Sequence, residues 1–510
     1  MNTQKNSLLK HFRTKLHPFQ IEHQRMEFPA GISASLQFAN KHSLGRKLRL
    51  SWLVSVGLLL VSGIRATAVQ KPNFILILTD DQGWTSSSQL MDNQISNSKS
   101  DYYETPNIER LASKGIRFTN GYAPCALCCP SRRSILFGQT PMRQGDDEQF
   151  KKNFNPGNSI QLSIPSLLKS IDPDYRTAHY GKWDLRADIF PEDVGYDESD
   201  GNTVNKNGDV SSGKETKFTA LFLNNDPKRI ETITDRAVNF MERQVKNGHP
   251  FYLQISHYAT HVDIQTKEET YKKYLQKKKG DIHSNPGWAG MLENLDLGIG
   301  KIMDEINQLG IADNTYLILI SDNGGVEFIP PVANKFDHPS VFKSHSRNYP
   351  LRGGKWTLYE GGIRVPFIVY GPRIKPGTQC DVPVAGWDIL PTLSDLAKNP
   401  NLLPDNLDGT SLRPLLEKGN TLKREREGLI FHYFGKSHSA IRLGDYKLIR
   451  FWDLKRTELY DLKKDPGELN DLSQKYPEKV SELEQLLINY IKEVHSEVLY
   501  PSASKNNNLN

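Results

Sequence analysis

The chain has 510 residues, of which 37% are hydrophobic and 24% are charged. These proportions are typical of a globular protein, and the length allows a large core and more than one domain. The formal net charge is only +6, and no DNA- or RNA-binding motif occurs, which argues against a dedicated nucleic-acid-binding protein.

The N-terminal residues have the pattern of an extension followed by an export signal. Residues 1–50 are polar and basic, residues 52–61 are apolar, and small residues follow at 66–68. The apolar run is shorter than the roughly 20 residues of a membrane span. We therefore interpret it as a cleaved secretory signal and expect a mature chain that begins near Val69, secreted or periplasmic, with no stable membrane span. Because the polar segment before the apolar run is long for a signal peptide, translation from an internal start codon, such as that of Met26, is an alternative.

The first predicted strand ends at two acidic residues. Residues 74–78 form a continuous apolar run, which is typical of a strand buried on both faces of an α/β sheet. Asp80 and Asp81 follow at the strand end, where such sheets bind ligands. Acidic residues are also common in solvated turns, so this pattern alone leaves a metal site and a plain turn open.

Three of the four cysteines lie within residues 125–129. No second cysteine pair or closely spaced histidine pair completes a zinc site, and no thioredoxin-like pattern surrounds the cysteines. A plain buried thiol remains an alternative. We predict a helix from about residue 133, which would place the cysteines near a helix N-terminus, where an anionic ligand or a thiolate is stabilised.

Further strands are predicted along the chain, and each leads into polar residues. They cover residues 175–180, before Lys182 and Asp184; 251–256, before His261; and 316–320, before Asp322 and Asn323. Amphipathic helices are predicted between strands at 105–115, 233–245 and 291–306. Together, Asp80, Asp81, Asp322 and Asn323 form an all-oxygen set, which favours Ca²⁺ or Mg²⁺ over zinc.

The last third of the chain changes character. A glycine-rich segment at 351–366 carries Lys355, and its glycines allow backbone to approach a site closely. Near residue 425 the alternation of strands and helices gives way to short strands separated by turns, and a helix over about 478–497 follows.

The order of these motifs resembles that of the type I sulfatases of the alkaline phosphatase superfamily. The segment Cys128-x-Pro-Ser-Arg132 is similar to the motif in which the cysteine is oxidised to formylglycine, and six separated motifs match across residues 72–475. The resemblance implies an α/β fold with a large mixed central sheet flanked by helices, plus a small C-terminal antiparallel sheet and helix. We expect a signal-bearing extension at 1–68, a catalytic domain at 69–424 and a C-terminal subdomain at 425–510.

The resemblance also implies a mechanism: a secreted sulfatase that uses a formylglycine nucleophile, made by a formylglycine-generating enzyme or an equivalent maturase, and Ca²⁺ or possible Mg²⁺. The implied ligands of the cation are Asp80, Asp81, Cys128, Asp322 and Asn323. Arg132 would hold the nucleophilic hydroxyl. Lys182, Lys355 and His261 would bind the sulfate, and His261 would also be the general acid.

Two positions depart from the family pattern. Asp184 stands where sulfatases usually carry a histidine, and Asp263 stands where a proline is usual. Asp184 could accept the proton released when sulfate is expelled, so we expect it within hydrogen-bond reach of residue 128 or Lys182.

The substrate implied by the resemblance is a sulfated carbohydrate, and we expect the loops at 187–228 and 326–350 to select it. Two other functions remain open. A phosphate or phosphonate ester hydrolase could use the same nucleophile and metal. A non-catalytic homologue could bind sulfated glycans without turnover, an alternative that the changes at Asp184 and Asp263 suggest.

Overall fold

The computed structural model describes residues 71–154, 162–186, 188–210, 221–327, 347–417, 419 and 421–496. The predicted export signal at 1–68 and most of the loop predicted at 326–350 lie outside these ranges. Within the described ranges, no helix has both the length and the apolar character needed to cross a membrane.

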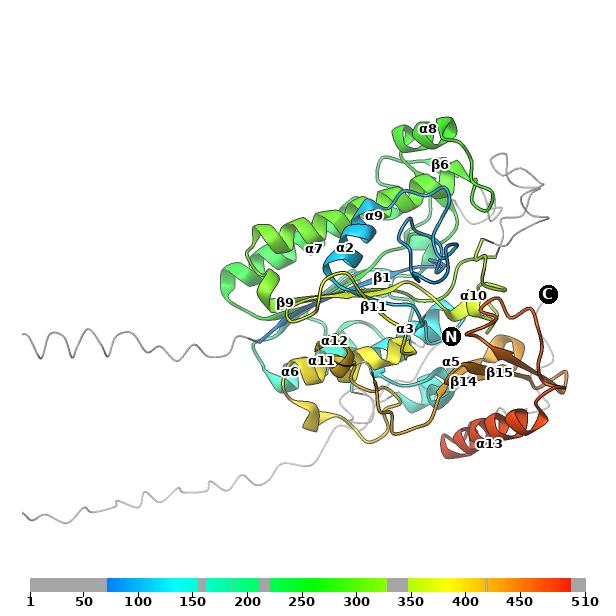
Figure 1. The fold of residues 1–510 in the computed structure, drawn as a ribbon. Helices are drawn as coiled ribbons and strands as arrows, with labels where there is room; N and C mark the ends of the chain where they lie inside the picture. The colour runs from blue at the N-terminus through cyan, green and yellow to red at the C-terminus, as the bar shows by residue number, and fades with distance from the viewer. Residues whose placement is uncertain are drawn as a thin grey trace, which may run out of the picture. The chain divides into compact units, whose positions relative to one another are not determined.

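An eight-stranded mixed sheet forms the centre of the fold (Figure 1). Its order is β11 (Thr378–Cys380), β2 (Ile116–Phe118), β10 (Phe367–Tyr370), β9 (Thr315–Ser321), β1 (Asn73–Thr79), β7 (Phe251–Ser256), β4 (Arg176–Gly181) and β5 (Glu198–Ser199). Strand β10 runs antiparallel to both of its neighbours, and the other pairs are parallel. The expected mixed α/β sheet is therefore confirmed.

Strand β1 lies between β9 and β7 and is buried along its whole length. Its alternating apolar side chains enter two different cores, Ile75 and Ile77 on one face and Phe74, Leu76 and Leu78 on the other. This explains why the strand is a continuous apolar run. Leu78 pairs with Ser256 and Ile320 on the neighbouring strands, so the three strands end side by side.

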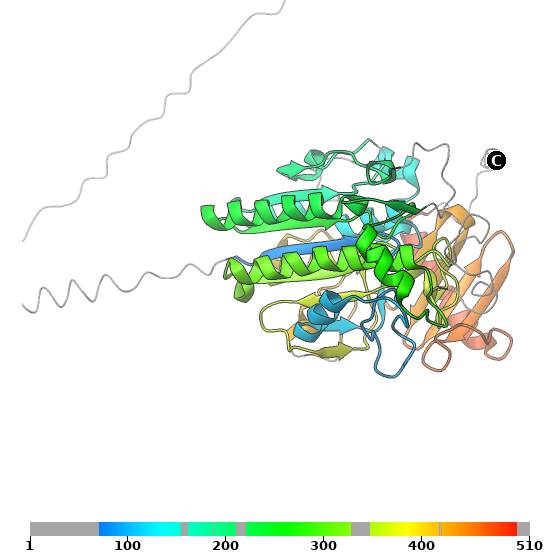
Figure 2. The same ribbon diagram turned by 90° about the horizontal axis from the view of Figure 1, so that it is seen from above.

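Helices cover both faces of the sheet (Figures 1 and 2). One face carries α2 (Pro106–Lys114), α7 (Ile230–Asn247) and α9 (Pro286–Gln308), which bury their apolar stripes there. The other face carries α3 (Cys128–Phe137), α6 (Ile164–Ile171), α11 (Ile389–Leu396) and α12 (Arg413–Glu417). All three amphipathic helices predicted from the sequence are present.

Shorter elements connect these layers. They are β3 (Gly121–Tyr122), paired with β12 (Val384–Ala385), β6 (Leu221–Leu223), paired with β8 (Ile264–Thr266), and the helices α4 (Pro141–Gln144), α5 (Asp147–Asn153), α8 (Glu268–Gln276) and α10 (Glu360–Ile363).

A second, antiparallel sheet follows residue 425, as expected. It contains β13 (Leu429–Tyr433), β14 (His438–Leu443), β15 (Tyr446–Phe451) and β16 (Arg456–Asp461) in sequence order. Helix α13 (Pro477–Glu493) packs on one face, where Leu483 and Leu487 meet Ile441 and Leu448. The opposite face packs against residues that precede the second sheet in the chain, including Tyr122 and Trp387.

The second sheet also holds the glycine-rich segment that carries Lys355. The ammonium group of Lys447 on β15 is fully buried and lies 2.9 Å from the carboxylate of Glu360. The Tyr359 hydroxyl donates a hydrogen bond of 2.8 Å to Glu458 on β16. A buried charge is stable only when it is paired, so these contacts fix the segment against the sheet.

Candidate active site

The ends of β1 and β9 bring acidic side chains together. Asp80 and Asp81 follow β1, and Asp322 follows β9, whose last residue is in register with the end of β1. One ligand atom each from Asp80, Asp81, Asp322 and Cys128 lies within 4.8 Å of the others, and all four residues are buried. Because parallel strands end at the same edge of a sheet, this clustering follows from the topology.

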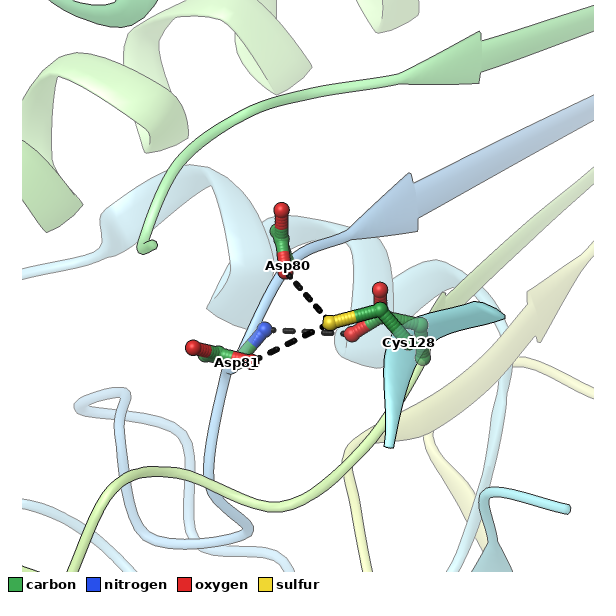
Figure 3. A group of neighbouring side chains, drawn as sticks. Asp80, Asp81 and Cys128 are labelled. Atoms are coloured by element: carbon green, nitrogen blue, oxygen red, sulfur yellow. Dashed lines mark hydrogen bonds between the residues drawn. The ribbon is translucent and has the colours of Figure 1, made fainter. Parts of the chain in front are cut away.

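Cys128 is the first residue of α3, and its sulfur points toward the two carboxylates that follow β1 (Figure 3). Its Sγ atom lies 3.7 Å from Asp80 Oδ1 and 3.9 Å from Asp81 Oδ1. The helix begins earlier than the predicted residue 133. Pro130 occupies its first turn, where backbone N–H groups have no partner within the helix, so a proline is tolerated there.

The Cys128 thiol is only 4% exposed. Burial raises the pKa of this thiol well above its usual value, and the charges of Lys182 and Lys355 offset only part of that effect. With this raised pKa the cysteine is a neutral thiol, which is a poor nucleophile.

Three basic side chains balance the three carboxylates. Arg132 donates from Nε and Nη2 to Asp322 Oδ2, at 2.9 and 2.7 Å. Lys182 Nζ lies 2.7 Å from Asp80 Oδ2, and Lys355 Nζ lies 2.7 Å from Asp81. The charges within the buried cluster are thus paired one to one.

Two of these carboxylates nevertheless differ in pKa. For Asp80, burial acts to raise the pKa, but Lys182, His261, Arg132 and Lys355 outweigh it and hold the pKa well below its usual value. For Asp322, burial and the charge of Asp80 raise the pKa to about 6 despite Arg132.

Asn323 provides a test of whether this cluster fits a metal ion. Its Nδ2 donates a hydrogen bond of 2.7 Å to Asp81 Oδ1. Its Oδ1 is buried and has no hydrogen-bond partner among the described residues. A buried acceptor without a partner is costly. An amide oxygen beside three carboxylates is the donor chemistry that Ca²⁺ and Mg²⁺ prefer, so the residues fit such a cation.

His261 follows β7 and faces the same cluster. Its Nδ1 lies 2.5 Å from the carbonyl oxygen of Val262, an arrangement in which Nδ1 donates its proton. Its Nε2 lies 3.9 Å from Asp81 Oδ2. Burial lowers the pKa of the imidazole, although the charges of Asp80 and Asp81 act in the opposite direction.

The two departures from the family pattern occupy different environments. Asp184 Oδ2 lies 3.6 Å from Lys182 Nζ, and Oδ1 lies 3.7 Å from Arg186 Nε. Both contacts are ion pairs, and the separation of Asp184 from Lys182 is slightly longer than a hydrogen bond. Asp263 forms a buried ion pair of 2.7 Å with Lys228.

A pocket of about 400 Å³ opens above the cluster and is lined by Cys128, Asp184, His261 and Lys355. Its other polar lining residues are Arg186, Asn205, Asp209, Asp263 and Trp356. Of these, only Asp263 is singled out by the sequence, although Asn205 and Asp209 lie in the loop at 187–228 that is expected to select the substrate. Arg186, Asn205 and Asp209 fall near or within a segment without helical or strand periodicity, where polarity alone does not separate binding residues from solvated ones.

Family models match most of the described chain. The sulfatase model matches residues 72–399. A model described as the C-terminal region of N-sulphoglucosamine sulphohydrolase matches residues 354–497.

Curated relatives share about a quarter of their residues with this chain. A sulfatase from Formosa agariphila is 28% identical, and the match covers 84% of this chain and 90% of that protein. An N-acetylgalactosamine-6-O-sulfatase from Bacteroides thetaiotaomicron is also 28% identical, with 82% of this chain and 93% of that protein covered.

Solved structures share the same architecture. The crystal structure of Ps i-CgsB has a TM-score of 0.64 at 25% identity and covers 83% of this chain and 93% of its own. The phosphonate monoester hydrolase of Agrobacterium radiobacter has a TM-score of 0.59 at 17% identity, covers 84% of this chain and 97% of its own, and is a likeness of fold alone.

Proposed function

Because this chain belongs to the sulfatase family of sulfuric ester hydrolases, we propose that it hydrolyses sulfate esters of a carbohydrate through a formylglycine made from Cys128 and a bound divalent cation. One observation carries this proposal. The cysteine of the sulfatase motif lies at the start of α3, 3.7 Å from Asp80, in a buried cluster that also contains Lys182 and Lys355.

The formylglycine and the divalent cation would together supply the nucleophile. A formylglycine at position 128 provides, as its hydrated aldehyde, a hydroxyl group that can attack sulfur, and a divalent cation lowers the pKa of a hydroxyl group beside it. Asp80, Asp81, Asp322 and Asn323 would hold that cation together with residue 128. We propose Ca²⁺, with Mg²⁺ as the alternative, since both prefer oxygen ligands.

The chain's own cations position the sulfate. Lys182 and Lys355 each lie 2.7 Å from a carboxylate of the cluster, so both ammonium groups already stand beside residue 128. They would stabilise the sulfate oxygens, whose charge shifts during transfer. Arg132 is one turn further along α3 and donates to both Asp322 and the carbonyl of Lys182, so it ties the acidic cluster to the sulfate-binding lysine.

His261 is the proposed general acid. Its Nδ1–H donates to the Val262 carbonyl, so the protonated imidazolium form would carry a second proton, on Nε2, that it can pass to the departing alkoxide. His261 also lines the pocket together with Cys128 and Lys355, which places that nitrogen on the side from which a substrate must enter.

A leaving-group series tests this role. We expect His261→Ala to lower kcat/KM by roughly 10²–10⁴-fold for alkyl and sugar sulfates. The loss for 4-nitrophenyl sulfate should be much smaller, because nitrophenolate departs without being protonated. Rates measured across phenols of increasing pKa would show this as a steeper dependence on leaving-group pKa in the variant. Equal losses for all esters would exclude proton donation by His261.

For Asp184 we propose an orienting role, since it contacts Lys182 and Arg186 as ion pairs at 3.6 and 3.7 Å. Asp184→Asn should then reduce kcat by only about tenfold, whereas a proton-transfer residue would cost roughly 10²–10⁴-fold. Asp184→His, which restores the residue usual in the family, serves as the matched comparison and should retain more activity. Steady-state kinetics of both variants decide between the two roles.

We further propose that the protein is secreted or periplasmic after cleavage near Val69, that residues 69–424 form the catalytic domain, and that residues 425–510 form the C-terminal subdomain. The argument for export is the apolar run at 52–61 followed by small residues. N-terminal sequencing of the mature protein tests the cleavage site.

The central experiment compares a sulfate and a phosphate ester of the same phenol. Preferred turnover of the sulfate ester would support the proposal, and preferred turnover of the phosphate ester would make the protein a phosphate or phosphonate ester hydrolase instead. Binding of sulfated glycans without any turnover would indicate the non-catalytic alternative. A panel of sulfated sugars then identifies the natural substrate.

A further inference from the structure

The pocket above Cys128 contains hydrogen-bond acceptors that the proposed mechanism does not use. Asn205, Asp209 and Asp263 line the same pocket as His261 and Cys128. Asn205 and Asp209 come from the segment between β5 and β6, and Asp263 directly precedes β8. We call these three residues the acceptor wall.

A buried lysine holds the acceptor wall in place. Lys228 Nζ lies 2.8 Å from Asp209 Oδ1 and 2.7 Å from Asp263 Oδ1, and the Lys228 side chain is fully buried. Gln265 Nε2 donates a further hydrogen bond of 2.9 Å to Asp263 Oδ1. Although burial acts to raise the pKa of Asp263, Lys228 outweighs it and lowers that pKa below its usual value. Asp263 is therefore ionised, and the ion pairs with Lys228 hold both carboxylates in position.

Part of the acceptor wall lacks hydrogen-bond donors. Asp263 is 3% exposed, and its Oδ2 has no hydrogen-bond partner within the described part of the chain. The same is true of Asn205 Oδ1. The Asp209 side chain is 21% exposed, so it remains open to a ligand. Because buried acceptors are costly when unpaired, the wall fits a ligand that brings donor groups.

The charges of the acceptor wall indicate which chemical class of ligand it can bind. The wall presents two carboxylates, and Lys228 supplies one positive charge behind them. An anionic substituent placed here would face like charges in a poorly solvated pocket, which is unfavourable. A hydroxyl group would instead donate a charge-assisted hydrogen bond to an unpaired carboxylate oxygen.

We propose that the acceptor wall binds hydroxyl groups of the sugar ring that carries the sulfate ester, so that the enzyme selects a neutral sulfated sugar over a sulfated uronic acid. The proposal rests on the proposed function, because it assumes that a sulfate ester occupies the cluster around residue 128. It assigns Asp209 and Asp263 to substrate specificity and gives Lys228 the role of a positioning residue.

The test uses three probes: a neutral hexose 6-sulfate, a 2-sulfated hexuronate and 4-nitrophenyl sulfate, which lacks a sugar. The unaltered enzyme should prefer the hexose sulfate over the hexuronate by ~10-fold or more in kcat/KM. Asp209→Asn should lower kcat/KM for the hexose sulfate by about 10–100-fold, mainly through KM, because a hydrogen bond to a charged acceptor is lost. The loss for 4-nitrophenyl sulfate should stay within ~3-fold, a difference that misfolding would not produce.

Two further variants sharpen the test. Asp263→Asn should show the same selective loss. If this variant does not fold because a buried charge has been removed, Asp209→Asn alone tests the proposal. Asp235→Asn is the matched control, because Asp235 is an exposed carboxylate on α7 paired with Lys301. It should change none of the three rates.

Several outcomes would overturn the proposal that the acceptor wall binds sugar hydroxyl groups. One is equal turnover of the hexuronate and the hexose sulfate by the unaltered enzyme, and another is an equal loss of hexose sulfate and 4-nitrophenyl sulfate turnover in Asp209→Asn. If no ester is hydrolysed at all, the proposed function fails. Binding of the same two sugars, measured by calorimetry, then still tests the proposal for the acceptor wall. Tighter binding of the hexose sulfate supports the proposal, and equal or reversed affinities overturn it.

Discussion

Cys128→Ala should abolish turnover of every sulfate ester, by at least ~10³-fold, while the protein remains folded. The expected loss is large because alanine offers no carbon that can become an aldehyde, and none of the lysines around it can replace an attacking hydroxyl group. Steady-state assays with 4-nitrophenyl sulfate measure the loss. Thermal unfolding should remain cooperative, since the substitution removes one sulfur atom and leaves the ion pairs of the cluster in place.

Mass spectrometry should show the modification directly. In active protein, the peptide that contains Cys128 should be lighter by about 18 Da, the difference between a thiol side chain and an aldehyde. Cys129→Ala is the matched control. Cys129 is the adjacent buried cysteine, with a pKa that burial raises to about 12, and its Sγ contacts the Leu185 carbonyl at 3.3 Å. That variant should remain active, and fully active protein with an unmodified Cys128 would contradict the mechanism.

Removal of the divalent cation should have a comparably large effect. The acidic cluster of Asp80, Asp81 and Asp322 is buried together with the unpaired amide oxygen of Asn323. Chelation should reduce turnover by at least ~10²-fold, and added Ca²⁺ should restore it. Ca²⁺ should also raise the Tm of the chelated protein, because it binds only the folded state.

The metal prediction has a readout that does not depend on activity. Asp322→Asn should weaken Ca²⁺ binding measured by calorimetry, because it removes one anionic ligand. Asp296→Asn is a matched control at another buried carboxylate, which accepts hydrogen bonds from the backbone of Asn107 and Ile108. Its Ca²⁺ affinity should be unchanged. Undiminished turnover after complete chelation would contradict a cation in the catalytic cluster.

Much of this arrangement could be predicted from the sequence, because it follows from local patterns. The apolar runs before Asp80 and Asp322 identify buried strands, and parallel strands end at a common edge. The contacts of Lys182 with Asp80 and of Lys355 with Asp81 join positions far apart in the chain. Periodicity carries no information about such pairs, so only the family resemblance suggested that these lysines belong to one site.

Other features could not be predicted. The helix predicted from about residue 133 begins earlier, at Cys128, and Pro130 fits its first turn. The ion pair of Lys228 with Asp209 and Asp263 depends on how an aperiodic segment folds back onto β8. Charge and polarity along that segment are equally compatible with a solvated loop.

The burial of Cys128 would set the timing of its proposed conversion to formylglycine. In the finished fold this side chain is 4% exposed, and the neighbouring Cys125 donates its thiol proton to the carbonyl of His432 on β13, at 3.2 Å. An enzyme that oxidises Cys128 would therefore have to act before this side chain is buried. Cys128 is synthesised well before the second sheet, which follows residue 425, so the proposed conversion would have an interval during synthesis that closes when folding is complete.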